Sequence, residues 1–316
     1  MISFIIIGKN EGWRLDKCLK SVHTVVVNDN ISNYEIIYVD SKSTDNSIEI
    51  AKSYSDVKVY LITGVCNAAI ARNIGATEAS GDILFFIDGD MEIQSGFLPL
   101  IVKNDNEMVY PFISGQNLDI LYDEEWNYIS SSNRWPIGDK DKYSTSAGGL
   151  FIITSELWKS VNGMDTRFKR SQDVDLGLRL ASKGVLLCRK PDLLAKHHTM
   201  MYIVRDEIGS YRKYTSLLAR KHIFNRHYYK LFLSSEYTVV ALIVSVIMSV
   251  VLKNPLALLL YFVFLLYKIF KLWGKTSKIK SPLSLALKRI KGDLLFCFFF
   301  ITFYPKAHDC QYIKIA

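Results

Sequence analysis

The first hundred residues alternate short apolar runs with amphipathic segments, and this alternation constrains the possible folds more than any other feature. The apolar runs are almost continuous in Ile, Val and Phe, as in parallel strands that are buried on both faces. The segments between them have helical periodicity, so the pattern predicts an α/β fold with a mostly parallel sheet and helices on both faces. The strands are expected at residues 3–7, 35–39, 57–62 and 83–87, and the helices at 15–26, 47–54 and 68–79.

The next hundred residues are less regular. Residues 104–147 are polar and poorly periodic, and we expect them to form strands and loops on the side of a second substrate. A Gly-Gly pair then leads into further regular structure, because apolar and helical patterns return. These elements are an apolar strand at 150–153, a helix at 156–161 and a helix at 173–183 that ends at Gly184.

The net charge of +8 is unevenly distributed along the 316 residues. Residues 1–200 carry 21 Lys and Arg and 26 Asp and Glu, a net charge of −5, whereas residues 201–316 carry 18 and 5, a net charge of +13. In segment 201–232 basic residues alternate with tyrosines, which suits a solvated helix face, nucleic acid or anionic lipid. Because apolar runs follow, we predict an interfacial helix on anionic membrane lipid and no nucleic-acid partner.

Three apolar runs follow, at residues 237–252, 256–267 and 294–304. A membrane-spanning helix needs about 17–25 residues, so the first two runs span only when their flanks are included. We predict that these two runs form a membrane hairpin, with a buried helical core as the alternative, and that the third run is interfacial or re-entrant. Region 233–316 is therefore assigned as a hydrophobic hairpin followed by an amphipathic C-terminal region.

Charge and cysteine content predict the compartment. Segment 268–291 carries Lys and Arg but no acidic residue, so the positive-inside rule places both flanks of the hairpin, and the sheet domain, on the cytoplasmic face of the cell membrane. The five cysteines lack any Cys-x-x-Cys spacing, which favours a reducing compartment over a disulfide framework or a zinc site. The apolar run at residues 4–7 is too short for a signal peptide.

Two carboxylates, Asp88 and Asp90, directly follow the fourth predicted strand. Ligands of parallel sheets bind at the carboxyl ends of strands, and paired carboxylates there can hold a hard divalent cation. A calcium-binding loop is excluded because Ile93 and Pro99 occupy the positions that require Gly and Glu. A solvated turn is the alternative for this motif alone. Asp40 follows the second strand in the same way and can accept hydrogen bonds from a base or ribose.

Six motifs in order resemble the family 2 glycosyltransferases of the GT-A fold, whose nucleotide-binding sheet is Rossmann-like. The resemblance covers about residues 2–200 and implies a GT-A domain there. The motifs are Ile5-Ile6-Ile7-Gly8-Lys9-Asn10-Glu11, Val39-Asp40-Ser41 with Ser43-Thr44-Asp45, Ala71-Arg72-Asn73-Ile74-Gly75-Ala76, Phe86-Ile87-Asp88-Gly89-Asp90, Gly148-Gly149 and Gln172-Asp173-Val174-Asp175-Leu176.

The resemblance implies one group of residues that binds the nucleotide of a nucleotide-sugar donor and another that binds Mn²⁺ or Mg²⁺ on the donor diphosphate. One of His197 and His198 matches a late metal-ligating histidine of related enzymes. An ordinary surface role is the alternative for this His pair and for Arg72. The nucleotide group is Asp40, Arg72, Asp88, Gly8, Asn10 and Glu11. The metal group is Asp90, Asp88 and either His197 or His198.

The resemblance also implies that Asp173 is the general base that deprotonates the acceptor hydroxyl. The family's usual Glu-Asp pair is here Gln172-Asp173, which keeps the base and removes a neighbouring negative charge. Gly148, Gly149 and Gln172 are expected on the acceptor side.

The expected function is that of an inverting, metal-dependent glycosyltransferase of the hexosyltransferase type. The donor is expected to be UDP-linked, and the acceptor to be a polyprenyl-diphosphate-linked or cell-envelope glycan that receives a single sugar. The alternatives are a catalytically silent nucleotide-sugar-binding scaffold, a nucleotidyltransferase, and a processive polysaccharide synthase. The processive alternative is weakened because the only Arg-Trp pair, Arg134-Trp135, precedes the Gly-Gly pair.

Overall fold

The computed structural model describes residues 1–103, 107–135, 138–200, 208–276 and 281–316. The chain divides into two compact units, which are considered separately. The first comprises Met1–Val204 and Lys306–Ala316, and the second comprises Arg205–Pro305.

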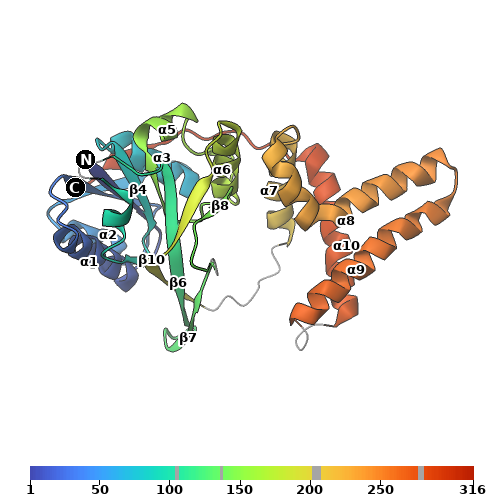
Figure 1. Cartoon of the computed structure of the whole chain (residues 1–316), viewed down its shortest axis with the longest axis horizontal. Helices are drawn as coiled ribbons and strands as arrows, with labels where there is room; N and C mark the ends of the chain where they lie inside the picture. Colours follow the sequence, from blue (N-terminus) through green and yellow to red (C-terminus); the bar gives the residue numbers. More distant parts are fainter. Residues whose placement is uncertain (104–106, 136–137, 201–207, 277–280) are drawn as a thin grey trace. The chain divides into compact units, whose positions relative to one another are not determined.

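The first unit is an α/β domain built around one sheet (Figure 1). Among the described residues the strand order is β11-β3-β2-β1-β4-β9-β6-β10-β5, with β7 paired to β6 and β8 to β10. The strands are β1 (Ile2–Gly8), β2 (Tyr34–Asp40), β3 (Val57–Ile62), β4 (Ile83–Asp88), β5 (Met91–Ile93), β6 (Phe112–Tyr122), β7 (Tyr128–Asn133), β8 (Lys142–Ser144), β9 (Phe151–Thr154), β10 (Leu187–Met200) and β11 (Tyr312–Lys314). The helices are α1 (Trp13–Asn28), α2 (Ser47–Lys52), α3 (Ala68–Glu78), α4 (Leu98–Ile101), α5 (Ser155–Ser160) and α6 (Gln172–Ser182).

The N-terminal half of the sheet is parallel, as the apolar runs predict. Strands β3, β2, β1 and β4 are adjacent and parallel, in a register that aligns Gly8 with Asp40 at their carboxyl ends. Alternate residues of β1 enter two different cores, because successive side chains of a strand point to opposite faces. Phe4 packs with α1 and α2 on one face, whereas Ile5 packs with α3 and α6 on the other.

The C-terminal half of the sheet corrects the prediction of a mostly parallel sheet. Here β9 is antiparallel to both β4 and β6, and β5 is antiparallel to β10. Only β6 and β10 pair in parallel in this half among the described strands. Within residues 104–147 strands were predicted without bounds, and the length of β6 was not foreseen because the polar residues 114–117 interrupt its apolar ends. Residues 104–106 and 136–137 of that stretch lie outside the described residues.

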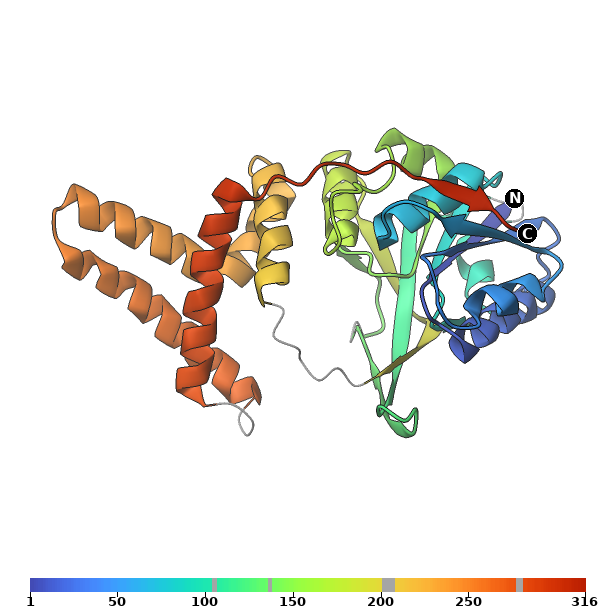
Figure 2. The same ribbon diagram turned by 180° about the vertical axis from the view of Figure 1, so that it is seen from behind.

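The last residues of the chain belong to the sheet and not to the apolar region. The sequence analysis placed residues 233–316 together, but β11 pairs antiparallel with β3 at the sheet edge (Figure 2). Tyr312 packs edge-on against Tyr60, and its hydroxyl donates a hydrogen bond to Glu78 at 2.6 Å. Three residues are too short to show a strand pattern, so this pairing is visible only in the tertiary structure.

The second unit is helical. Its elements are α7 (Ile208–Lys221), α8 (Arg226–Val251), the 3-10 helix η1 (Pro255–Leu258), α9 (Leu259–Thr276) and α10 (Pro282–Thr302). Helices α8 and α9 form a hairpin with η1 at its turn (Figure 1). Among the described residues, two helical segments are long and apolar enough to cross a membrane, Arg226–Val251 and Pro255–Trp273. The third apolar run lies in α10, and residues 201–207 of the predicted interfacial segment lie outside the described residues.

Buried charges tie these helices together, which the sequence analysis did not anticipate. Helix α8 leaves helical geometry at Glu236 (φ −117°, ψ 20°), whose carboxylate meets Arg212 of α7 at 2.6 Å and Arg289 of α10 at 2.9 Å. Asp293 of α10 accepts hydrogen bonds from Arg212 and from the hydroxyl of Tyr261 in α9. Buried charges are tolerated only when paired, so this network selects one packing of the four helices.

We predict that Gly75→Val destabilises the sheet domain. A Cβ atom at Gly75 would lie 2.2 Å from Cγ2 of Ile5, so α3 approaches β1 only because this position has no side chain. Overpacking of this kind costs about 1–3 kcal/mol of the free energy of unfolding, measured by urea titration. Thr77→Val, on the exposed side of the same helix, is the control and should change stability by less than about 0.5 kcal/mol. Equal stability of the two variants would contradict the close packing.

Candidate active site

A cleft of about 350 Å³ lies at the carboxyl ends of β1 and β4. Four of the predicted donor-site residues line it, and Ser41, Cys66 and Asn67 join them. Ser41 follows β2, and Cys66 and Asn67 follow β3, so these three residues also lie beyond strand ends. The sequence analysis did not select them because it looked mainly for charged side chains. The four predicted residues are Gly8, Glu11, Asp88 and Asp90.

The loop after β1 is held against the loop after β2. Asn10 adopts the left-handed conformation (φ 59°), and its side-chain oxygen accepts a hydrogen bond from the backbone N–H of Thr44 at 2.7 Å. The carbonyl of Gly8 accepts from the N–H of Ser41 at 2.9 Å. A Cβ atom at Gly8 would lie 2.9 Å from Cγ of Glu11, so glycine lets the Glu11 side chain fold back over the strand end.

The carboxylate of Asp40 is used inside this turn. Asp40 is fully buried and accepts hydrogen bonds from the hydroxyl of Tyr38 at 2.8 Å and from the N–H and hydroxyl of Ser43 at 2.7 and 2.6 Å. The strand-end position of Asp40 is as predicted. Its partners, however, give the carboxylate a structural role in the loop and do not favour direct contact with a base or ribose.

Three carboxylates gather at the floor of the cleft. Burial and repulsion from Asp90 raise the pKa of Glu11 to about 7, although Arg14 opposes the shift. Burial raises the pKa of Asp88 to about 6, with Arg72 opposing the shift and Asp90 adding to it. Burial is the larger cause of both shifts, and repulsion between the neighbouring carboxylates adds to it.

Arg72 is a buried residue, which excludes the alternative of a helix-surface arginine. Its side chain is 3% exposed, and its Nη2 lies 2.5 Å from Oδ1 of Asp88. The same nitrogen donates to the carbonyl of Gly149 at 3.1 Å. Arg72 therefore positions Asp88 and the Gly-Gly segment.

The two adjacent histidines point to different partners. Nε2 of His197 lies 3.3 Å from Asp90, and its Nδ1 lies 2.8 Å from Asp119. Burial lowers the pKa of His197, but hydrogen bonds to the two carboxylates outweigh it, and the net shift is upward. His198 instead pairs with Glu92 at 3.1 Å, and burial lowers its pKa.

The predicted general base, Asp173, lies close to the carboxylates of the cleft. Asp173 lies in the first turn of α6 and accepts hydrogen bonds from the hydroxyl of Ser146 at 2.8 Å and the N–H of Gly148 at 3.0 Å. The next residue, Gly149, lies so close to Asp88 that a Cβ atom would be 1.8 Å from its Oδ2. One dipeptide therefore separates the base from the carboxylate cluster. Gln172 opens α6, and its buried Oε1 has no hydrogen-bond partner among the described residues.

Several residues of the site were missed by sequence reasoning. Arg189 is buried, donates to the carbonyls of Ser146 and Ala147 at 3.2 Å, and stacks over Trp135 at 4.7 Å. Arg134 lies 3.5 Å from Asp119. The Arg134-Trp135 pair was noted only as a misplaced processive-enzyme motif, although β6 and β10 bring it to the site. No local pattern reveals these contacts because they join distant strands.

The carboxylate cluster fits a divalent cation. Oδ1 of Asp90 is buried and has no hydrogen-bond partner among the described residues, so one oxygen ligand is available. Carboxylate oxygens suit Mn²⁺ or Mg²⁺, and a diphosphate can supply further oxygen ligands to either ion. No three His, Cys, Asp or Glu side chains are close enough to form a preformed metal cage, as far as the described part of the chain extends.

Comparison with known families agrees with this geometry. The model of the family described as glycosyl transferase family 2 matches residues 3–155. This part of the chain is a family 2 glycosyltransferase domain. The match includes β1 to β9 with the carboxylate cluster, and it ends before Asp173 and the two histidines.

Curated relatives of the glycosyltransferase domain are themselves glycosyltransferases. The chain is 28% identical to human polypeptide N-acetylgalactosaminyltransferase 3 in an alignment of 257 positions that covers 70% of this chain and 40% of that protein. It is 27% identical to the amylovoran biosynthesis glycosyltransferase AmsB of Erwinia amylovora in an alignment of 225 positions that covers 63% of this chain and 74% of AmsB. The chain thus spans well under half of the human relative's length.

Solved glycosyltransferases share the GT-A fold predicted from the motifs. The S. aureus TarS fragment 1–349 with UDP superposes with a TM-score of 0.51 at 13% identity, over 71% of this chain and 66% of TarS. GalNAc-T7 with UDP, GalNAc and Mn²⁺ superposes with a TM-score of 0.53 at 18% identity, over 69% of this chain and 48% of that protein.

We predict that Gly149→Ala weakens UDP binding by the glycosyltransferase domain in the presence of Mn²⁺. The added methyl group displaces the Asp88 carboxylate and its ion pair with Arg72. Isothermal titration calorimetry should show at least about a tenfold loss of affinity, which corresponds to 1.4 kcal/mol. Gly209→Ala is the control, since Gly209 lies in α7 of the helical unit and has open space at its Cβ. Similar losses in both variants would point to general misfolding.

Proposed function

We propose that this protein is an inverting, metal-dependent glycosyltransferase that moves one sugar from a UDP-sugar to a hydroxyl group of a lipid-linked or cell-envelope glycan. One observation carries the proposal. The Gly148-Gly149 dipeptide joins Asp173 to the carboxylate cluster, so a proton acceptor and a diphosphate site face one small space. A transferase that displaces its leaving group directly needs these two functions side by side.

The donor assignment rests on the carboxylate cluster and on the solved relatives. TarS and GalNAc-T7 were both solved with UDP, and GalNAc-T7 also with Mn²⁺. In this chain Asp90, Asp88 and His197 would hold the cation, with Asp119 orienting the imidazole from its other nitrogen. When bound, the cation neutralises the charge that develops on the leaving diphosphate.

The chemistry of the chain's own residues is proton transfer and positioning. Asp173 takes the proton of the acceptor hydroxyl, whose oxygen forms a bond to the anomeric carbon while the bond from that carbon to the phosphate oxygen breaks. Attack from the face opposite to the leaving group inverts the anomeric centre. The hydrogen bonds from Ser146 and Gly148 fix the Asp173 carboxylate, and Arg189 fixes the loop that supplies them.

The helical unit supports a membrane-associated acceptor. Only 28% and 17% of the residues in the two most apolar windows are buried, which a soluble core helix would not tolerate. We therefore propose that this unit associates with the cell membrane, and that Lys and Arg in segment 268–291 keep the sheet domain on the cytoplasmic face.

We predict that Asp173→Asn slows sugar transfer by about 10²–10⁴-fold and leaves UDP affinity unchanged. Asparagine keeps an oxygen that can accept from Ser146 and Gly148 but cannot take the proton. The assay is a screen of UDP-sugars with Mn²⁺ and Mg²⁺ on the detergent-purified chain, scored by release of UDP. Asp192→Asn, at an exposed position of β10, should transfer at the wild-type rate. A wild-type chain that binds UDP and metal but transfers no sugar would instead establish the scaffold alternative.

We predict that His197→Ala lowers the affinity for Mn²⁺ in the presence of UDP at least about tenfold, whereas His198→Ala changes it little. The reason is that the imidazole of His197 contacts the Asp90 carboxylate, whereas His198 meets Asp90 through its backbone N–H and turns its imidazole to Glu92. Asp119→Asn should give an intermediate loss, since partners that orient a metal ligand are worth about 10–100-fold in affinity. Electron paramagnetic resonance of free Mn²⁺ measures the Mn²⁺ affinity of all three variants. Equal effects of the two histidine variants would exclude this assignment.

A further inference from the structure

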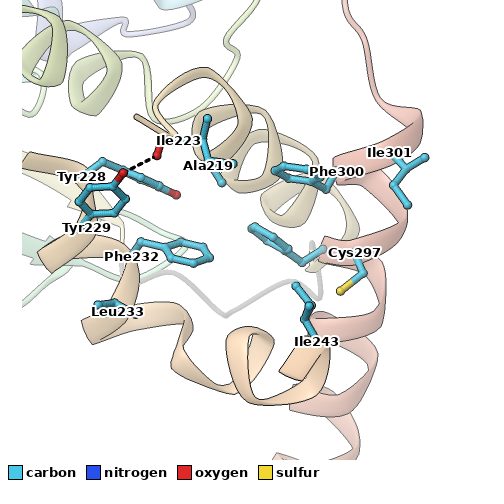
Figure 3. Close-up of a pocket in the computed structure, with 11 residues that line it drawn as sticks. Ala219, Ile223, Tyr228, Tyr229, Phe232, Leu233, Ile243, Cys297, Phe300 and Ile301 are labelled. Carbon is cyan, nitrogen blue, oxygen red and sulfur yellow. Dashed lines mark hydrogen bonds between the residues drawn. The ribbon is translucent and has the colours of Figure 1, made fainter. Parts of the chain in front are cut away.

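The helical unit contains an apolar pocket of about 470 Å³ between α7, α8 and α10 (Figure 3). Its walls are aliphatic and aromatic side chains. The hydroxyl of Tyr229 is already used, because it donates to the carbonyl of Ile223 at 2.9 Å. The volume falls within the range of about 300–1,000 Å³ that is typical of small-molecule sites. The walls include Ala219, Tyr228, Phe232, Phe296 and Phe300.

The rim of this pocket is exposed and apolar. Ile301 is 71% exposed and Leu233 is 54% exposed, and the neighbouring Phe224 is 91% exposed. Both rim residues lie on helices with long apolar segments, and α8 is long enough to span a membrane. A hydrocarbon chain can therefore enter from a bilayer without crossing a polar surface.

One end of the same helices is strongly basic. Segment 208–235 carries six Lys and Arg side chains and no Asp or Glu. Two of them are used within the helical unit, because Arg212 is buried against Glu236 and Asp293, and Arg220 donates to backbone carbonyls at residues 300 and 303. Arg226 and Lys230 are exposed on the first turns of α8 and flank Tyr229 of the pocket. An apolar pocket with cations on its own helix complements a molecule that has a hydrocarbon tail and a phosphate head.

We propose that this pocket binds the hydrocarbon chain of the lipid-linked acceptor, with the lipid phosphate or diphosphate held at the basic α7–α8 turn around Lys221, Arg226 and Lys230. The inference rests on the proposed function, whose acceptor class it specifies as an isoprenyl phosphate lipid. The hydrocarbon chain of the lipid makes the apolar contacts with the pocket, and its phosphate distinguishes it from bulk membrane lipid.

The test uses the full chain in detergent and a photoreactive C15 isoprenyl phosphate, with cross-linked peptides mapped by mass spectrometry. We expect peptides of α8 and α10 to be labelled. Unlabelled isoprenyl phosphate should reduce this labelling by competition, whereas isoprenyl alcohol or inorganic phosphate should not. Ala219→Phe fills the pocket and should lower labelling by about tenfold, as a single misfit in an apolar pocket does. Lys230→Gln should weaken competition by the phosphate lipid about threefold or more.

Matched controls separate the pocket from the general lipid surface. Val250 is 72% exposed on α8 and lies outside the pocket, so Val250→Phe should be labelled like the wild type. Lys253→Gln, in the hairpin turn, should also be labelled like the wild type. UDP binding should be unchanged in every variant, and Leu233→Trp on the rim repeats the test if Ala219→Phe does not fold. Competition by the alcohol equal to that of the phosphate would mean that bulk lipid fills the pocket and would overturn the proposal. Labelling that rises on dilution would indicate a second copy of the chain and would overturn it too.

The outcome is distinguishable from failure of the proposed function. If no UDP-sugar is turned over with any acceptor, the glycosyltransferase proposal fails. If UDP is released during transfer and every pocket variant transfers to isoprenyl phosphate acceptors at the wild-type rate, only the pocket assignment fails.

Discussion

The candidate site depends on three carboxylates that gather, partly buried, at one edge of the sheet. Glu11 and Asp88 lie near Asp90, and the pKa values of both groups are raised, chiefly by burial and further by Asp90. Arg72 forms an ion pair with Asp88. Because Gly149 has no side chain, Asp88 can approach the Gly148-Gly149 segment that donates a hydrogen bond to Asp173. The rest of the domain positions this cluster, because parallel strands bring their carboxyl ends to one edge.

The two units have opposite electrostatic requirements. The sheet domain is acidic, in agreement with the cation that we propose at its diphosphate site, whereas the helical unit is basic and has an apolar surface. Within the helical unit, Glu236 and Asp293 pair with Arg212 and Arg289 and fix how the helices pack. The overall charge of +8 therefore reflects the helical unit and not the nucleotide site.

Much of the first hundred residues could be predicted because each element there has its own local pattern. The strand predicted at residues 57–62 coincides with β3, and the others agree with the structure to within two residues. The C-terminal half of the sheet was less predictable, since polar residues interrupt the middle of β6 and β11 is only three residues long. The burial of Arg72 was also undecided, because a helical pattern does not show which helix face the sheet covers.

The sequence by itself determined the alternation of strands and helices, the GT-A motifs and the residue types at each strand end. The tertiary structure decided which of those residues meet. His197 and His198 are chemically identical neighbours in the sequence, and only their opposite directions on β10 place one beside Asp90 and the other beside Glu92. Asp40 was likewise placed correctly at a strand end, while its hydrogen bonds to Tyr38 and Ser43 became known only from the fold. Local order follows from short-range pattern, whereas a site is made by contacts between residues far apart in the chain.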